Sequence, residues 1–404
     1  MKAKPRIAVV SPFLDKRHGT ERCVSEQIER LAQDYEIHVY SSSIQDVDLS
    51  NIIWHRIPGL PGPHLTKFVW FFLANHLSRW WDGRFAKLDF DLVFTPGINC
   101  WNADIIAVHI VFTEFYRLVH QELALRRNPV RMWPWLIHRS LSYHLFMVLE
   151  RRVYARDETL LPVTSRKMEQ DLQRCFNRNG RTPLVYYGVD LDQMNPARRE
   201  SLREEARHDL KLPEDAFAIL LIGNDWKKKG LRCLIEAVGS LSTSHLWILV
   251  VGRDESFSYP DILRRSGLEN RMTILPIVQQ VEKYYAAADM YAGPSLEDSF
   301  AMPPLEAMAC GLPVVVSRQA GVSELVTHGV DGFVLEDPTD SRQLAEFIQR
   351  IYTSADLRQQ IGRSAEATAR QYTWQRNAQD MKKVFEECLL EKGRDVPVAY
   401  SQSR

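Results

Sequence analysis

The chain has 404 residues, 45% of them hydrophobic, and its 51 basic and 51 acidic residues give a formal net charge of zero. This length allows two domains with separate cores, and the balanced charge argues against a general nucleic-acid-binding protein. The six cysteines are scattered without a close pair, so we expect no zinc site, no disulfide framework and a reducing, cytoplasmic compartment. We also expect no signal peptide, and no segment has the roughly eighteen apolar residues of a membrane span.

The first half of the chain alternates strand and helix patterns. Strands are predicted at residues 6–11, 36–40, 91–95, 104–109 and 159–163, and helices at about 21–33 and from Ser165 onward. A second alternation starts after residues 187–190, with strands at 217–223, 246–252, 272–276, 290–293, 314–316 and 332–335. Its helices are predicted at 230–241, 260–267, 281–288, 305–310 and 341–353. This order predicts an α/β fold with two parallel, doubly wound sheets.

We therefore expect two Rossmann-like domains, at residues 1–185 and 186–372, with a ligand in the cleft between them, because ligands of open α/β sheets lie beyond the carboxyl ends of the strands. Neither half carries Gly-x-Gly-x-x-Gly after its first strand. A nicotinamide or flavin cofactor is therefore not expected.

Residues 294–317, PSLEDSFAMPPLEAMACGLPVVVS, hold the densest chemical signal. Pro303 and Pro304 fit the first turn of a helix, and the acids Asp298 and Glu306 flank the loop and the helix start. Amides at a helix N-terminus attract phosphate, and acids can hold sugar hydroxyls, so the segment predicts a nucleotide-sugar site. The same pattern also fits ordinary α/β architecture, in which acids near helix starts are caps.

Three further places carry chemistry. Residues 222–230, IGNDWKKKG, place three lysines between a predicted strand and a predicted helix. These lysines could stabilise a departing diphosphate. The alternative is an ordinary solvated basic turn. Gly19 and Thr20 follow the first strand. A flexible turn at this place would let the backbone approach a sugar diphosphate. The alternative is a turn without a binding role. His109 ends a predicted strand, a place where histidine is more often structural than catalytic.

Residues 294–317 resemble the signature of the retaining glycosyltransferases of family four, Glu-x7-Glu followed by Ala-Met-Ala-x-Gly-x-Pro-Val. Asp298 replaces the first glutamate and Glu306 matches the second, while Glu297 is an alternative acid one position out of register. Further similar motifs cover nearly the whole chain: Gly19-Thr20-Glu21-Arg22, Tyr187-Gly188-Val189-Asp190, Ala286-Ala287-Ala288-Asp289, residues 329–333 and Tyr372-Thr373-Trp374. The resemblance implies the GT-B fold, with a last helix at about 373–392 that crosses back to the N-terminal domain.

The resemblance also implies site roles. His109, Lys229 and Asp298 are the expected catalytic residues, and Gly19, Thr20, Lys228, Lys229, Asp298, Ser299, Phe300, Ala301 and Glu306 are expected to bind the donor. In this scheme Lys228, Lys229 and the amides of residues 299–301 stabilise the diphosphate, Asp298 and His109 contact the sugar, and Glu306 holds the ribose. Asn224 stands where the family commonly has arginine, and the lysine motif is closest to the lipopolysaccharide-core glucosyltransferase branch.

The implied reaction is retaining, metal-independent transfer of a hexose from a nucleotide-sugar, by default a UDP-sugar, without a further cofactor. Neither a glycosidase-like pair of carboxylates nor an Asp-x-Asp metal motif is visible in the sequence. Two alternatives share the fold: a sugar-nucleotide epimerase, and a non-catalytic homologue that acts as a binding subunit. Asp298 and Asn224 favour the non-catalytic alternative, whereas Lys229, Glu306 and Gly19 oppose it.

The acceptor side is expected in the N-terminal half. Two stretches, residues 64–81 and 117–156, combine tryptophan with arginine or lysine, a composition that suits an anionic lipid surface. The alternative is a pair of helices that pack on the sheet and expose solvated charge. We expect a peripheral enzyme on the inner face of the cytoplasmic membrane, in cell-envelope or lipopolysaccharide biosynthesis. Its acceptor is then a glycan or glycolipid, and no nucleic-acid partner is expected.

Overall fold

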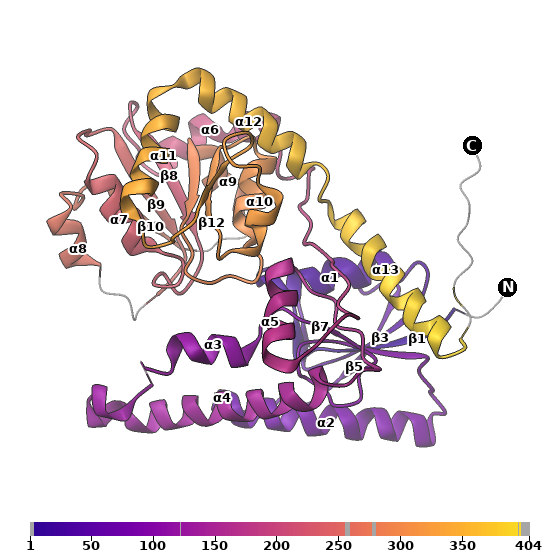
Figure 1. Cartoon of the computed structure of the whole chain (residues 1–404). Helices are drawn as coiled ribbons and strands as arrows, with labels where there is room; N and C mark the ends of the chain where they lie inside the picture. Colours follow the sequence, from indigo (N-terminus) through magenta and orange to yellow (C-terminus); the bar gives the residue numbers. More distant parts are fainter. Residues whose placement is uncertain (1–3, 122, 255–258, 277–279, 395, 397–404) are drawn as a thin grey trace, which may run out of the picture. The chain divides into compact units, whose positions relative to one another are not determined.

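The computed structural model describes residues 4–121, 123–254, 259–276, 280–394 and 396. Contacts within the chain define two compact units. Unit 1 comprises Met1–Tyr186 with Gln375–Arg404, and unit 2 comprises Tyr187–Trp374. In Figure 1, unit 1 runs from indigo to magenta and ends in the yellow helix, while unit 2 runs from pink to orange.

Unit 1 is built on a parallel sheet with the strand order β5-β3-β1-β6-β7. These strands are β1 (Arg6–Val10), β3 (Glu36–Ser41), β5 (Ile52–Arg56), β6 (Leu92–Pro96) and β7 (Ile105–Ala107), and a separate small pair joins β2 (Phe13–Leu14) to β4 (Ser43–Ile44). In the register, Ile7 lies between Ile37 and Leu92. Because side chains alternate along a strand, each strand supplies apolar residues to both faces of the sheet.

The helices of unit 1 cover both faces of this sheet. They are α1 (Gly19–Leu31), α2 (His64–Phe85), α3 (Phe112–Val119), α4 (Trp133–Tyr154), α5 (Arg166–Phe176) and α13 (Trp374–Glu391), with short 3-10 turns at Leu125–Arg127 and Val130–Met132. Ile7 and Val9 share a core with α1 and α13, whereas Ala8 and Val10 share another with α2, α4 and α5. The ring of Phe385 on α13 lies 5.4 Å from that of Phe94 on β6, so the last helix belongs to unit 1.

Unit 2 contains a parallel sheet with the order β10-β9-β8-β11-β12-β13. Its strands are β8 (Phe217–Ile222), β9 (Leu246–Val251), β10 (Met272–Leu275), β11 (Met290–Gly293), β12 (Val314–Ser317) and β13 (Phe333–Leu335). Its helices are α6 (Pro196–Asp209), α7 (Leu231–Gly239), α8 (Pro260–Arg265), α9 (Glu282–Ala287), α10 (Met302–Ala309), α11 (Ser341–Thr353) and α12 (Ala355–Ala369), with a 3-10 turn at Gly321–Leu325. Strand order reverses between β8 and β11, which is where open α/β sheets bind ligands.

The two ends of unit 2 lie side by side. The backbone N–H of Val189 donates to the carbonyl of Tyr372 over 2.9 Å, and Val189 and Thr373 form a parallel bridge. The rings of Tyr187 and Trp374 are 6.3 Å apart. The chain therefore enters and leaves unit 2 at one place.

The predicted α/β class with two parallel sheets is confirmed. Residues 159–163 do not form the regular strand predicted for them, and Leu160 and Val163 make only isolated bridges. The reason is Pro162, which has no N–H to donate to a ladder. The predicted strand at 104–109 is shortened to β7, and β5, α6 and α12 were absent from the prediction.

Candidate nucleotide-sugar site

The lysine loop of unit 2, residues 223–230, joins β8 to α7 and is held against the segment that follows β11. Gly230 has a φ of 75°, and a Cβ at this position would lie 1.9 Å from the carbonyl oxygen of Pro294. Only glycine permits this approach. The backbone N–H of Leu296 then donates to the carbonyl of Lys228 over 2.7 Å. Residues 223–230 and 294–301 therefore form one structure at the carboxyl ends of two adjacent strands.

Lys229 and Asp298 meet at this junction. The ammonium Nζ of Lys229 forms an ion pair with Oδ2 of Asp298, and the two side chains are 23% and 15% exposed. The stem of Lys229 lies over Gly223, where a Cβ would come within 2.6 Å of Cε of the lysine. Lys228 pairs instead with Oδ2 of Asp225 over 2.7 Å. The structure thus brings the predicted diphosphate cation and the predicted sugar acid into contact.

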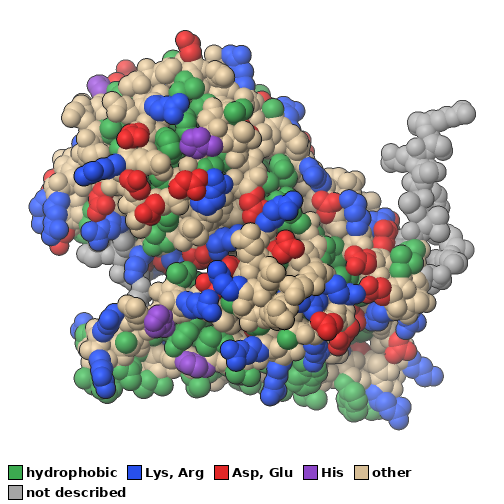
Figure 2. Space-filling model, viewed as in Figure 1, with side chains coloured by type: hydrophobic (Ala, Val, Ile, Leu, Met, Phe, Trp, Pro, Cys, Tyr) green, Lys and Arg blue, Asp and Glu red, His purple; other side chains and the backbone are tan. Residues whose placement is uncertain are grey.

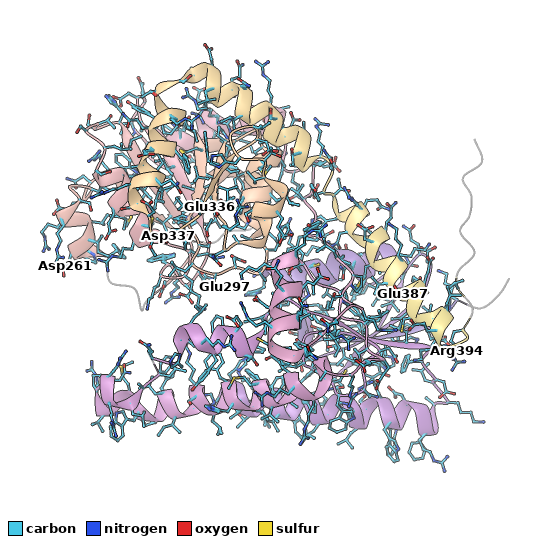
Figure 3. The ribbon with its side chains drawn as sticks, viewed as in Figure 1. Asp261, Glu297, Glu336, Asp337, Glu387 and Arg394 are labelled. Carbon is cyan, nitrogen blue, oxygen red and sulfur yellow. The ribbon has the colours of Figure 1, made fainter. Side chains whose placement is uncertain are left out.

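The loop from Asp298 to α10 is fixed by its own backbone. Oδ1 of Asp298 accepts from the N–H of Phe300 over 3.3 Å, and the carbonyl of Asp298 accepts from the N–H of Gly321 over 3.2 Å. The ring of Phe300 is buried against Tyr187, with the ring centroids 5.1 Å apart. Ala301, with a φ of 69°, precedes α10. Glu297, labelled in Figure 3, lies on the same loop, but Asp298 is the acid that contacts Lys229.

Glu306 lies on the buried side of α10 and is 5% exposed. Its Oε2 accepts from the hydroxyl of Tyr285 on α9 over 2.6 Å. Burial, reinforced by the carboxylate of Glu306, raises the pKa of Tyr285, so the phenol remains a donor. Sequence reasoning missed Tyr285, because the only signal is a tyrosine beside the Ala286-Ala287-Ala288-Asp289 motif.

A second cation stands at this edge of the sheet. Arg253 follows β9, the neighbour of β8, and its backbone N–H donates to Oδ1 of Asn224 over 2.9 Å. Asn224 is the residue that replaces the arginine common in the resembling family. Sequence reasoning also missed Arg253, although an arginine directly after a buried strand is a visible signal.

In unit 1, Gly19 and Thr20 form the first turn of α1, and an acid shapes the loop before them. Asp15 accepts from the backbone N–H groups of Arg17 over 2.8 Å and His18 over 2.9 Å. Burial works to raise the pKa of Asp15, but these bonds outweigh it and the pKa is lowered. An ionised carboxylate therefore holds the entry to the helix.

His109, also in unit 1, follows β7 and precedes α3. Burial lowers the pKa of His109 to about 4, so its imidazole is neutral at neutral pH. The following helix has no side-chain cap of its own. Instead the buried Glu150 on α4 accepts from the N–H of Phe112 over 2.5 Å and from the N–H and hydroxyl of Thr113, each over 3.0 Å. Burial raises the pKa of Glu150 to about 7, despite these bonds.

The candidate residues thus form two groups. Lys228, Lys229, Asp298, Ser299, Phe300, Ala301 and Glu306 gather in unit 2, and Gly19, Thr20 and His109 lie in unit 1 beyond the carboxyl ends of its strands. Over the described ranges, no set of three or more His, Cys, Asp or Glu side chains is arranged to hold a metal ion.

One face of unit 1 is both apolar and basic. Along α2, Trp80 and Trp81 are 61% and 58% exposed, and Trp135 on α4 is 51% exposed. The helices touch through Phe68 and Phe146, whose rings are 4.8 Å apart. Figure 2 shows hydrophobic and basic side chains along the lower edge of the view, where α2 and α4 lie.

Each of the helices α2 and α4 carries one acid, and both acids bond within unit 1. Glu150 of α4 is fully buried, and Asp82 of α2 accepts from the hydroxyl of Tyr40 over 2.6 Å. The exposed basic residues here include Arg126, Arg127, Arg131, Arg151 and Arg152. None of the helices in the part of the chain that the structure describes is long and apolar enough to cross a membrane.

Comparison with known proteins agrees with this geometry. Residues 203–368 match the family model described as Glycosyl transferases group 1. A D-inositol 3-phosphate glycosyltransferase of Salinispora tropica is 28% identical over 258 residues, which are 60% of this chain and 53% of that protein. The chain thus spans about half the length of this curated relative.

Solved structures resemble the whole chain at lower identity. WaaG, a glycosyltransferase involved in lipopolysaccharide biosynthesis, is 20% identical with a TM-score of 0.75, covering 94% of this chain and 98% of WaaG. Anabaena HepE, solved in complex with UDP and glucose, is 20% identical with a TM-score of 0.68, covering 94% and 99%. The predicted GT-B fold is confirmed, and residues 203–368 match the glycosyl transferases group 1 family model.

Proposed function

We propose that the chain is a retaining, metal-independent glycosyltransferase. It moves a hexose from a nucleotide-sugar, by preference a UDP-sugar, to a hydroxyl of a lipid-linked or lipopolysaccharide-type acceptor. The observation that carries the proposal is the contact of Lys229 with Asp298 inside the group 1 domain. A cation suited to a diphosphate and an acid suited to sugar hydroxyls stand together, as a sugar diphosphate requires. The UDP and glucose complex of HepE supports the choice of nucleotide.

In the proposed reaction, the bond between the anomeric carbon and the β-phosphate oxygen breaks. The acceptor oxygen forms the new bond on the same face, and its proton passes to the leaving phosphate oxygen. Lys228 and Lys229 stabilise the charge that develops on the diphosphate. Asp298 accepts hydrogen bonds from the sugar. These roles need no protein base and no additional cofactor.

The remaining residues orient the donor. Glu306 holds the ribose, and the Tyr285 hydroxyl on its Oε2 fixes the carboxylate. Gly19 and Thr20 approach the sugar diphosphate with their backbone. His109, whose pKa is about 4, is neutral and suited to a hydrogen bond with the transferred sugar rather than to proton donation.

The test is donor turnover by the full chain across UDP-, GDP- and ADP-sugars. Lys229→Ala and Glu306→Ala are expected to abolish turnover of the donor that the wild type uses. Lys283→Ala is the matched control, because Lys283 pairs with Glu205 on the surface of the same unit. Sugar that stays on the nucleotide in a changed configuration would instead identify an epimerase. If the wild type binds none of these donors, the chain is a non-catalytic binding subunit.

For the acceptor, we propose a peripheral position at the inner face of the cytoplasmic membrane, through α2 and α4. Exposed tryptophans suit the lipid interface, and exposed arginines suit anionic headgroups. The cation of Arg139 lies 5.0 Å from the ring of Trp135, so the basic and aromatic groups are interleaved.

This position is tested by co-sedimentation with phosphatidylcholine vesicles, with and without phosphatidylglycerol. We expect binding only with the anionic lipid, and weaker binding after Arg151→Gln with Arg152→Gln on α4. The same change at Arg264 and Arg265 on α8 removes an equal charge from unit 2 and should have no effect. Equal binding by all three proteins, or none by the wild type, would exclude the membrane surface.

A further inference from the structure

The ammonium of Lys229 contacts the carboxylate of Asp298, although both residues are assigned to the donor. Asp298 uses its two oxygens differently: Oδ1 accepts from the N–H of Phe300, and Oδ2 contacts the ammonium of Lys229. The lysine stem lies over Gly223, where a side chain would displace it, and this path brings the ammonium to the acid. A diphosphate that binds Lys229 must therefore take this cation from Asp298 or share it.

A nucleotide-sugar compensates Asp298 for the loss of its cation. The sugar lies directly beyond the β-phosphate, and its hydroxyls can donate to the carboxylate in place of the ammonium. Lys229 exchanges one anionic partner for another. Since hydrogen bonds to an ionised carboxylate are strong, both members of the pair remain satisfied when the complete donor is bound.

The nucleoside diphosphate that remains after transfer offers no such compensation. It brings no hydroxyl to Asp298, and its terminal phosphate now has a second ionisable oxygen and carries about −1.5 to −2 charges at neutral pH. This charge stands beside an acid that is only 15% exposed, where water screens poorly. Asp298 therefore repels the product at the same time as it competes for Lys229.

We infer that Asp298 sets the preference of the site for a nucleotide-sugar over the free nucleoside diphosphate, and that it promotes product release by recapturing Lys229. The inference rests on the proposed function and deepens it. The role of Asp298 is then double, since the same carboxylate recognises the sugar and rejects the product.

The test is isothermal titration calorimetry of UDP and UDP-glucose with the full chain. Asp298→Asn removes the charge but keeps Oδ1 as an acceptor for Phe300. We expect this variant to bind UDP about tenfold more tightly than the wild type, while its affinity for UDP-glucose does not rise. Asp298→Glu should restore weak UDP binding. Glu366→Gln, which breaks the surface pair with Arg370 on α12, is the matched control and should change neither affinity.

A measurement on the wild type alone avoids any effect of substitution on folding. The β-methyl ester of UDP has the charge of a donor but no sugar, and the wild type should bind it more tightly than UDP. In Asp298→Asn the two ligands should bind equally. If the wild type binds UDP and its methyl ester alike, or Asp298→Asn leaves UDP affinity unchanged, the inference is wrong and the proposed function stands. If the wild type binds neither UDP nor UDP-glucose, the proposed UDP-sugar donor fails together with the inference.

Discussion

The two units treat charge in opposite ways at the places where their candidate residues lie. In unit 2, Lys229 and Asp298 form a partly exposed ion pair. In unit 1, burial moves the pKa of His109 down to about 4 and that of Glu150 up to about 7, so both groups are driven toward their neutral forms. The ion pair of unit 2 can therefore exchange ionic partners, whereas burial in unit 1 favours uncharged side chains.

The largest effect is expected from a backbone change in unit 2 that separates the lysine loop from residues 294–301. Gly230→Ala forces a Cβ against the carbonyl oxygen of Pro294 at a φ of 75°. We expect the free energy of unfolding to fall by about 3 kcal/mol and donor binding to weaken as the two loops separate. Thermal unfolding and calorimetry measure both quantities.

The control for this substitution is Gly267→Ala. Gly267 has a similar φ of 64°, but a Cβ added there would meet no atom within 4 Å, so only the backbone strain remains. Its loss should be about 1 kcal/mol. Equal losses at the two glycines would show that the approach of residue 230 to Pro294 carries no stability.

The next prediction concerns unit 1, where Glu150 should make the free energy of unfolding depend on pH. A carboxyl group with a folded-state pKa raised to about 7 keeps its proton in the folded chain at pH values where the unfolded chain has lost it. Stability should therefore fall as the pH rises from about 4.5 to 7, by about 3 kcal/mol in total. Glu150→Gln removes this dependence. Denaturant unfolding across this range measures it, and the exposed Glu158→Gln is the control. An unchanged slope in Glu150→Gln would mean that Glu150 is ionised throughout.

An effect of comparable size and opposite sign is expected for His109. Its pKa is lowered to about 4, so between pH 6.5 and 4 the unfolded chain binds the proton first. Stability should fall as the pH decreases through this window, by at most about 1.4 kcal/mol per pH unit. His109→Gln should remove that dependence, and the exposed His120→Gln should leave it. Between pH 7 and 8 neither protein should show a contribution from residue 109, and NMR titration of the imidazole checks this directly.

The smallest expected effect is on UDP binding after substitution of Arg253. This substitution tests whether a cation other than Lys228 and Lys229 contributes to donor binding. Its position after β9, bonded through its backbone to Asn224, places a cation at the donor edge. Arg253→Ala should weaken UDP binding roughly threefold, in keeping with a partly exposed charge. Arg265→Ala on α8 is the control. An unchanged affinity would show that Arg253 does not replace the arginine that the resembling family commonly has at the position of Asn224.

Much of unit 2 was predictable because its local signals agree with each other. The prediction for 341–353 matches α11, whose N-cap Asp340 accepts from the N–H groups of Arg342 and Gln343. The prediction for 290–293 matches β11, a fully buried strand. In contrast α6 was missed, because its sequence PARRESLREEARHD shows no apolar stripe. It is held by arginines, such as Arg203, that reach Asp289 over 2.5 Å.

The site divides along the same line. A lysine-rich loop and a pair of acids are local patterns, and their resemblance to a known signature singled out Lys229 and Asp298. Their direct contact, the Tyr285 bond to Glu306 and the capping of α3 by Glu150 join residues between 21 and 69 positions apart. Such pairings are set by the packing of helices on sheets, so no local periodicity or spacing encodes them.

Because Val189 and Thr373 are bridged, the two ends of unit 2 are close enough to be joined by a short connection. Unit 2 is an insertion in unit 1, and its two ends leave from one point. Closing such a gap costs little chain entropy, because only a short connection is needed. We therefore expect that the segment between Tyr186 and Gln375 can be replaced as one piece. Cleavage of only one of the two connections between the units leaves them covalently joined through the other.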